Sequence, residues 1–292
     1  MKQSVRKIVN VFFKKTVPPR GCFLISFFGK IRKMYLLFIF LFGLFIGSFL
    51  NALLYRLDKE ESVLKGRSFC PSCRHTLAWF DLIPVLSWLY LKGKCRYCGK
   101  KISVQYLAVE VSTAFLFALA FLRFEPSGFF NFLIFSYYLA LICFLIVIFI
   151  YDLRTYLILD KVIYPAILFV LFFKIFFVFQ DYLENTLLVD LMSALGAAGF
   201  FFFLVVITKG QGMGMGDVKL AFFMGLLLGW PQIIVALFLS FFVGSVVGVG
   251  LVSLNKKGWK SQVPFGPFLA GATILMIFYG NYLTNLGISL II

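Results

Sequence analysis

Long apolar runs recur along most of this 292-residue chain and constrain its fold more than any other feature. Many of them reach about 18 residues, the length at which a helix can cross a hydrocarbon core about 30 Å thick. Hydrophobic residues make up 62% of the chain and charged residues only 14%, which is outside the range of a soluble domain. The sequence therefore predicts an all-α polytopic membrane protein.

We expect about eight transmembrane helices, of which the sixth is short and contains Gly225 and Gly229 before Pro231. The predicted ranges are 34–55, 104–123, 129–151, 162–180, 186–208, 218–231, 232–254 and 264–283. The segment 56–103 is the one sizeable soluble part between them. Residues 104–292 then form the main membrane domain.

The net charge of +16 would suit a nucleic-acid-binding protein, but the distribution of the charge argues against that partner. The segment 56–103 holds ten basic and four acidic residues, so the positive-inside rule places it in the cytoplasm. The connections 152–161, 209–219 and 255–263 then face the same side and carry Lys or Arg. The lipid bilayer, rather than nucleic acid, is the expected environment of the chain.

The N-terminal segment departs from this pattern. Residues 1–33 contain nine basic residues and no acidic residue, yet the predicted topology places them on the outer side. One interpretation is a mis-assigned start or a dispensable extension before Met34. The other is an amphipathic surface segment that stays inside and alters the first crossing.

Four cysteines in the soluble segment form two C-x-x-C pairs, Cys70 with Cys73 and Cys95 with Cys98. Two such pairs are typical of a structural zinc site, because four thiolates complete a tetrahedron and leave no open position. Disulfides are the alternative, although a cytoplasmic location would disfavour them. His75 follows the first pair and could replace one ligand, but four thiolates suffice.

Two aspartates occupy helix ends that the charge pattern places on one membrane face, Asp152 and Asp217. Carboxylates at such depth are costly and usually functional. Two carboxyl groups that share a site cannot both ionise cheaply, so the pair should hold one proton, as in aspartyl proteases. Asp160 lies in the same connection as Asp152 and is a rival for the first position, or else a helix cap.

A simpler alternative gives these carboxylates structural roles. Asp152 could pair with Arg154 or Lys219 as an interfacial anchor, and Asp217 could cap a helix. The glycines before Asp217 favour the functional interpretation, since Gly214 and Gly216 permit close backbone approach beside an extended substrate.

The ordered motifs of the chain from Met34 onward resemble the type IV prepilin leader peptidases, a family of GxGD-type intramembrane aspartyl proteases. The matching segments are residues 47–51, 55–57, 70–73, 81–88, 95–98, 152–160, 214–219 and 264–268. Asp58 and Leu159 stand where the family often has Pro. Both aspartates of the pair are in place.

The resemblance implies cleavage of the leader of prepilins or pseudopilins after a Gly, at the cytoplasmic face of the bacterial inner membrane. It assigns catalysis to Asp152 and Asp217, and it assigns Gly214, Gly216, Lys219 and Asp160 to the active-site motifs. It also implies methylation of the new N-terminus with S-adenosylmethionine. We find no glycine-rich strand-to-helix pattern for the methyl donor, so that activity rests on the resemblance alone.

Three other functions stay open. The chain could be a peptidase without methyltransferase activity, or a transporter whose aspartates carry protons or ions. The cysteine pairs and the lack of a visible internal repeat argue against transport. A non-catalytic scaffold with a zinc loop is the third, and it would tolerate loss of both aspartates.

Overall fold

The computed structural model describes residues 22–59, 66–180, 187–210, 213–254 and 263–291. Its helices are α2 (Cys22–Asp58), η1 (Trp79–Leu82), α3 (Leu86–Tyr90), α4 (Val104–Phe124), α5 (Phe129–Thr155), α6 (Asp160–Phe179), α7 (Leu187–Ile207), α8 (Met215–Leu228), α9 (Gln232–Ser253) and α10 (Gly266–Ile291). Two isolated β-bridges are the only strand-like pairings among these residues. The predicted all-α membrane fold is confirmed.

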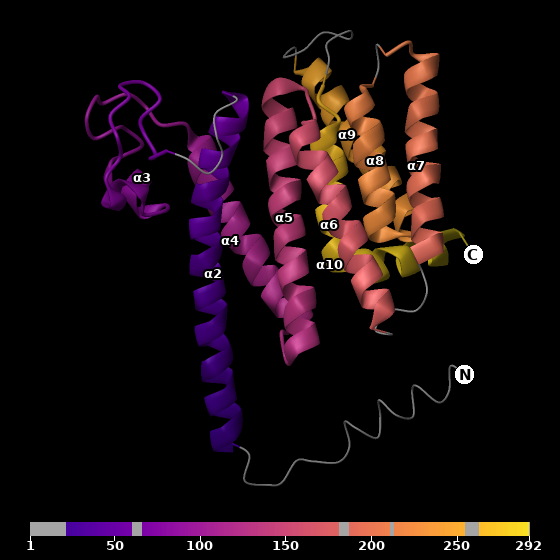
Figure 1. The fold of residues 1–292 in the computed structure, drawn as a ribbon, viewed down its shortest axis with the longest axis horizontal. Coiled ribbons are helices and arrows are strands. Elements are labelled where there is room, and N and C mark those ends of the chain that lie inside the picture. The colour runs from indigo at the N-terminus through magenta and orange to yellow at the C-terminus, as the bar shows by residue number, and fades with distance from the viewer. Residues whose placement is uncertain (1–21, 60–65, 181–186, 211–212, 255–262, 292) are drawn as a thin grey trace.

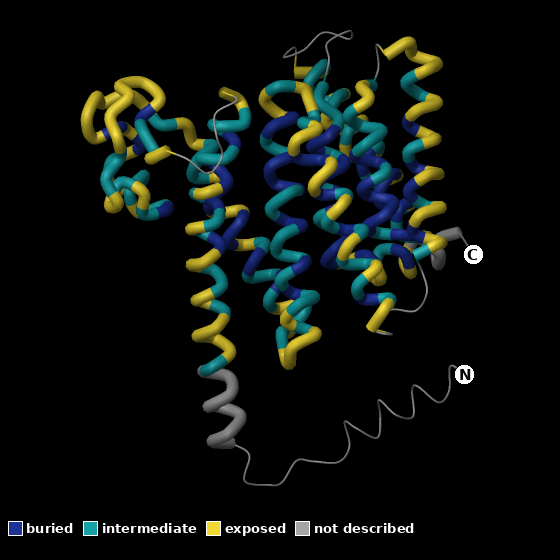
Figure 2. The backbone as a smooth tube through the Cα atoms, viewed as in Figure 1, coloured by how far each residue is buried: buried dark blue, intermediate teal, exposed yellow. Residues whose placement is uncertain are grey.

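The long helices run roughly parallel to one another and form two groups (Figure 1). At one edge, α2 packs along α4, and the segment between them folds into a small lobe beside the bundle. The remaining helices, α5 to α10, form the larger group, in which α10 packs against α5, α8 and α9. Buried residues gather along the inner faces of α5, α8 and α10 (Figure 2).

Within the described part of the chain, seven helices are long and apolar enough to cross a membrane. The remaining predicted crossing, the sixth, corresponds to α8, whose 14 residues span only about 21 Å. It begins at Met215 and ends at Leu228, ahead of the predicted range 218–231, because Gly229 at φ +68° stops the helix. α8 is held inside the bundle, where a Cβ on Gly225 would lie 2.5 Å from the Cα of Ala194 on α7.

The first helix, α2, begins at Cys22, before its predicted start at Met34. Residues 22–33 of the basic N-terminal segment therefore belong to this helix. Residues 1–21 lie outside the described part of the chain. Arg32 forms an ion pair with Glu125 at 2.6 Å, after the end of α4. This contact joins the start of α2 to the connection between α4 and α5.

Glycines allow α2 and α4 to approach closely. A Cβ on Gly43 would lie 2.6 Å from the Cα of Ala114, and a Cβ on Gly47 would lie 2.6 Å from the Cα of Glu110. The spacing Gly43-x-x-x-Gly47 is the pattern by which membrane helices bring their backbones together. Gly47 was expected only as part of a family motif, so its packing role is an addition from the structure.

Gly47→Val is therefore expected to lower the free energy of unfolding by about 1–3 kcal/mol, because the added atoms must push α2 away from α4. The measurement is the thermal unfolding midpoint of the purified protein in detergent. Gly196→Val is the matched control, since Gly196 is also helical and a Cβ added there would have nothing within 4 Å. Equal shifts for the two variants would contradict the packing role.

Candidate active site and metal site

The predicted site residues lie at one end of the bundle, which we name the loop end because it carries the cysteine loop, residues 66–103. The end of α2 meets the end of α5 there, where Arg154 lies 3.9 Å from Asp58. The starts of α6 and α8 meet there through Asp160 and Lys219. The charge-based prediction that these helix ends share a face therefore agrees with the structure.

Asp152 lies in the last turn of α5 and is only 4% exposed. Its Oδ2 atom is buried and has no hydrogen-bond partner within the described residues. The backbone of Gly266, at the start of α10, lies against this carboxyl group, since a Cβ there would come within 2.5 Å of Oδ2. A buried carboxyl oxygen without a partner is costly, which is typical of a site kept for a substrate or water.

Asp217 lies in the first turn of α8, where its Oδ2 accepts a hydrogen bond from the N–H of Gly214 at 3.2 Å. This contact is the helix cap that the simpler alternative anticipated, and a carboxylate at this position also faces the positive end of the helix dipole. A Cβ on Gly216 would lie 3.0 Å from the Cβ of Ile158, so the glycine allows α8 to start close to the connection between α5 and α6.

Asp152 and Asp217 lie at ends of helices that share the same neighbours. α5 and α8 both pack against α6 and α10. Arg154 pairs with Asp58, and Lys219 pairs with Asp160. The alternative in which Asp152 anchors the helix end by pairing with Arg154 or Lys219 is therefore not what the structure shows. The structure therefore places both aspartates at the loop end, Asp152 in the last turn of α5 and Asp217 in the first turn of α8.

Asp160 occupies a different environment from Asp152. It is the first residue of α6, it is exposed, and its Oδ1 accepts a hydrogen bond from the Nζ of Lys219 at 2.5 Å. The ammonium group of Lys219 also lies 5.1 Å from the ring centre of Tyr164. Asp160 thus joins the start of α6 to α8 through Lys219, which follows Asp217 by two residues.

The four predicted metal ligands form one cluster. The Sγ atoms of Cys70, Cys73, Cys95 and Cys98 all lie within 4.8 Å of one another, and those of Cys70 and Cys98 are 3.9 Å apart. A tetrahedron with Zn–S bonds of about 2.3 Å requires sulfur atoms about 3.8 Å apart. The cluster could therefore hold a metal ion after side-chain shifts of about 1 Å or less.

The two cysteine pairs share one backbone conformation. The N–H of Cys70 donates to the carbonyl of His75 at 2.9 Å, and the N–H of Cys95 donates to the carbonyl of Lys100 at 2.8 Å. Burial acts to raise the pKa of Cys70, but hydrogen bonds from the backbone of Cys73 and Ser72 and from neighbouring thiols lower this pKa to about 7. A thiol that ionises near neutral pH is suited to bind a metal.

His75 does not join the sulfur cluster. Its ring lies 3.7 Å from the ring of Tyr97, centre to centre. The Tyr97 hydroxyl donates to the carboxylate of Asp81, which also accepts from Nε of Arg96 at 2.8 Å. Burial acts to raise the pKa of Asp81, yet these hydrogen bonds outweigh it and hold the pKa below its usual value.

Glu110 is a buried acid that was not predicted from the sequence. It lies on α4, is 8% exposed, and its Oε2 accepts a hydrogen bond from the N–H of Val85 at 2.8 Å. The contact fixes the segment between η1 and α3 to α4, and so holds the cysteine loop in place. An acidic residue inside a predicted spanning helix was a signal that could have identified it.

An ion pair that was not predicted from the sequence lies between α6 and α7 and joins Lys174 to Asp190. The opposite charges neutralise each other in the bundle, which joins the two helices. This arrangement differs from the unpaired carboxyl oxygen of Asp152.

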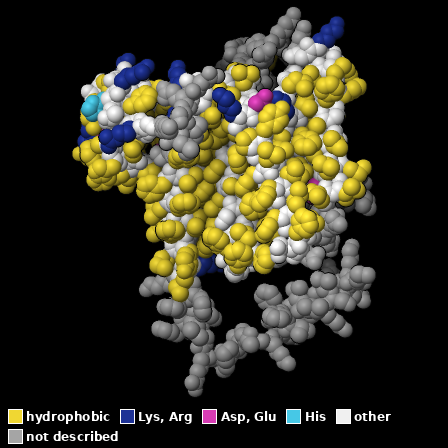
Figure 3. Space-filling view, viewed as in Figure 1, with side chains coloured by type: hydrophobic (Ala, Val, Ile, Leu, Met, Phe, Trp, Pro, Cys, Tyr) yellow, Lys and Arg dark blue, Asp and Glu magenta, His cyan; other side chains and the backbone are white. Residues whose placement is uncertain are grey.

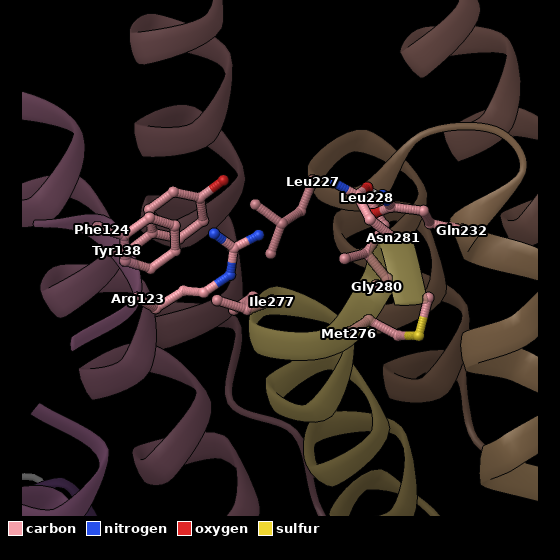
Figure 4. Close-up of a pocket in the computed structure, with 10 residues that line it drawn as sticks. All are labelled: Arg123, Phe124, Tyr138, Leu227, Leu228, Gln232, Met276, Ile277, Gly280 and Asn281. Atoms are coloured by element: carbon pink, nitrogen blue, oxygen red, sulfur yellow. Dashed lines mark hydrogen bonds between the residues drawn. The ribbon is translucent and has the colours of Figure 1, made fainter. Parts of the chain in front are cut away.

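A cavity of about 130 Å³ lies away from the loop end, where Arg123 at the end of α4 points toward α8 and α10 (Figure 4). Arg123 donates to the carbonyl of Phe278, and Gln232 donates to Asn281. Pockets for ligands of drug-like size usually measure about 300–1,000 Å³. The cavity therefore does not fit S-adenosylmethionine and is remote from the aspartates.

Comparisons with known sequences agree with these motifs. The profile of the Bacterial Peptidase A24 N-terminal domain matches residues 41–124, which include the four cysteines. The profile of the Type IV leader peptidase family matches residues 139–249, which include Asp152 and Asp217. No solved structure matches the chain significantly.

Three relatives share the name prepilin leader peptidase/N-methyltransferase. The protein of Bacillus subtilis (strain 168) is 36% identical over 247 residues, covering 83% of this chain and 94% of the relative. That of Aeromonas salmonicida (strain A449) is 30% identical over 285 residues, covering 89% and 96%. That of Myxococcus xanthus (strain DK1622) is 33% identical over 244 residues, covering 80% and 68%. The chain thus belongs to the type IV leader peptidase family.

Proposed function

We propose that this membrane protein is a prepilin peptidase that cleaves leaders with Asp152 and Asp217 and then methylates the new N-terminus. The observation that carries the proposal is the buried carboxyl oxygen of Asp152, which has no partner within the described residues, at the same end of the bundle as Asp217 in the first turn of α8. The names of the relatives support both activities.

The pair can hydrolyse a peptide bond without a covalent intermediate. One carboxylate takes a proton from water, and the resulting hydroxide attacks the scissile carbonyl carbon while the protonated partner donates its proton to the carbonyl oxygen. Collapse of the tetrahedral intermediate breaks the C–N bond, and the leaving amine receives a proton from the pair. In this mechanism Asp160 transfers no proton, because its carboxylate is hydrogen-bonded to the ammonium group of Lys219.

The proposed substrates are prepilins or pseudopilins in the bacterial inner membrane. Their leader would lie in the cytoplasm and their apolar helix in the bilayer, so the scissile bond would reach the loop end from the cytoplasmic side. The basic residues of the cysteine loop support this orientation.

The proposed metal of the cysteine cluster is zinc, held by Cys70, Cys73, Cys95 and Cys98. A closed tetrathiolate site stabilises a fold and offers no position for substrate. S-adenosylmethionine would supply the methyl group to the amine that cleavage releases.

The test is incubation of the purified full-length protein with a full-length prepilin and labelled S-adenosylmethionine. Mass spectrometry should show loss of the leader after Gly and a gain of one methyl group on the new N-terminal amine. An intact prepilin would refute the peptidase, whereas cleavage without label would refute the methyltransferase only.

Gly266→Ala is expected to lower the cleavage rate roughly tenfold or more, because the new methyl group would displace the Asp152 carboxyl group. Gly271→Ala is the matched control on α10, since its nearest contact would be the ring of Phe149 at 3.9 Å. The initial rates of prepilin cleavage at equal protein concentration compare them. Equal rates would show that Gly266 does not position Asp152.

A further inference from the structure

One surface of the cysteine loop is strongly apolar although it lies outside the spanning helices. Its side chains are large and solvent-accessible in the protein alone, with exposed fractions of 78% for Trp79 and 79% for Tyr90. We name this surface the aromatic patch, and its residues are Trp79, Phe80, Leu82, Leu86, Leu89 and Tyr90. Soluble surfaces seldom expose this many large apolar side chains together, and such patches mark interaction sites.

The patch is continuous across η1 and α3. The guanidinium carbon of Arg96 lies 4.8 Å from the ring centre of Phe80 and 6.0 Å from that of Tyr90, so it bridges the two elements. Trp79 packs edge-on against Phe80. On α3, Leu86 and Tyr90 are one helical turn apart and share a face.

The patch is also rigidly placed. Asp81 anchors Arg96 by an ion pair at 2.8 Å, and Glu110 on α4 anchors the N–H of Val85 between η1 and α3. These two contacts hold η1 and α3 in the arrangement that leaves the apolar side chains exposed. A fixed apolar surface needs an external partner.

The position of the patch identifies that partner. In Figure 1, α3 forms the lower edge of the loop, below the level at which α5 ends and α6 begins, and so at a depth shared with the spanning helices. Figure 3 shows hydrophobic side chains on this lower edge, next to the apolar flank of the helices, with Lys and Arg above them. The patch thus continues the surface that already faces lipid.

We propose that the aromatic patch inserts into the headgroup region of the bilayer and anchors the cysteine loop as an interfacial element. Tyr and Trp favour this depth because their rings are apolar and their N–H or O–H groups stay hydrated. The exposed Lys92 and Lys94, which follow α3, face acidic headgroups. The loop is then held by lipid in addition to its contacts with α2 and α4.

The test measures the depth of Trp79 in full-length protein reconstituted into nanodiscs. The difference in tryptophan emission between wild type and Trp79→Phe isolates the signal of Trp79 from those of the other tryptophans. Lipids brominated near the headgroup end of the acyl chain are expected to quench more than half of this signal, whereas aqueous iodide quenches little of it. Quenching by iodide but not by bromolipid overturns the proposal.

Two further arms keep the result interpretable. The double variant Leu86→Asn, Leu89→Asn should lose most of the bromolipid quenching of Trp79 while its metal content, measured by mass spectrometry, stays at the wild-type level. Unchanged quenching in this variant overturns the role of α3 in insertion. If Trp79 is shielded from iodide only after a prepilin is added, the patch binds substrate and the lipid assignment is wrong.

Discussion

Asp152→Asn and Asp217→Asn are each expected to lower the rate of prepilin cleavage by about 10²–10⁴-fold, the range that a positioned acid or base contributes. An amide can neither accept the proton of water nor donate one to the scissile carbonyl, so each change removes one of the two roles. Asn is close to Asp in size, so packing around α5 and α8 should persist. Gel separation of prepilin from mature pilin over time measures the rate.

Asp160→Asn is the comparison that separates the two candidates for the first position. It should lower the rate by less than about tenfold, because it weakens the contact with Lys219 but leaves the catalytic pair intact. A loss for Asp160→Asn as large as that for Asp152→Asn would overturn the assignment. Methylation of a pre-cleaved pilin by all three variants would show that they are folded.

Substitution of Cys70 and Cys95 by Ser should abolish stoichiometric zinc binding and unfold the cysteine loop, because the loop is too small to bury a large core. The expected changes are a fall from about one zinc per chain to none and rapid proteolysis between α2 and α4. Methyl transfer and cleavage should both weaken, while the cleavage site stays the same. Metal analysis and limited proteolysis of the purified protein measure these effects.

Cys143→Ser is the matched control, since Cys143 lies on α5 outside the sulfur cluster. It should keep the zinc content of the wild type. If zinc remained bound after both loop substitutions, the metal assignment would fail, and if the loop stayed protease-resistant without zinc, its fold would not depend on the metal.

Charge and hydropathy predicted much of the fold. They located the helices, and the Lys and Arg residues near their ends placed Asp152 and Asp217 on one face. The cysteine spacing was equally informative, because a C-x-x-C turn directs both sulfurs to one point whatever surrounds it. Both kinds of signal are local, so they can be recognised without knowing which helices touch.

Contacts between distant segments were harder to predict. The resemblance favoured Asp152, but Asp160 remained a rival, because the ion pair of Asp160 with Lys219, 59 residues further on, is visible only in the structure. Gly266 has no side chain to suggest that it faces a carboxyl group. The position of α8 was also misjudged by three residues, because Gly229 lies within an apolar run and the stop depends on its backbone conformation.

The close packing of α2 on α4 has a consequence for how the family can diversify. The thiolates and the aromatic patch come from residues 66–103, whereas the aspartates come from α5 and α8. Mutations that reshape one half disturb the other where the two halves meet, which is mainly where α4 packs on α5 and where Arg154 pairs with Asp58. A lineage could therefore abandon the N-terminal half gradually, or recruit it for another task, while selection still preserved proteolysis in the rest.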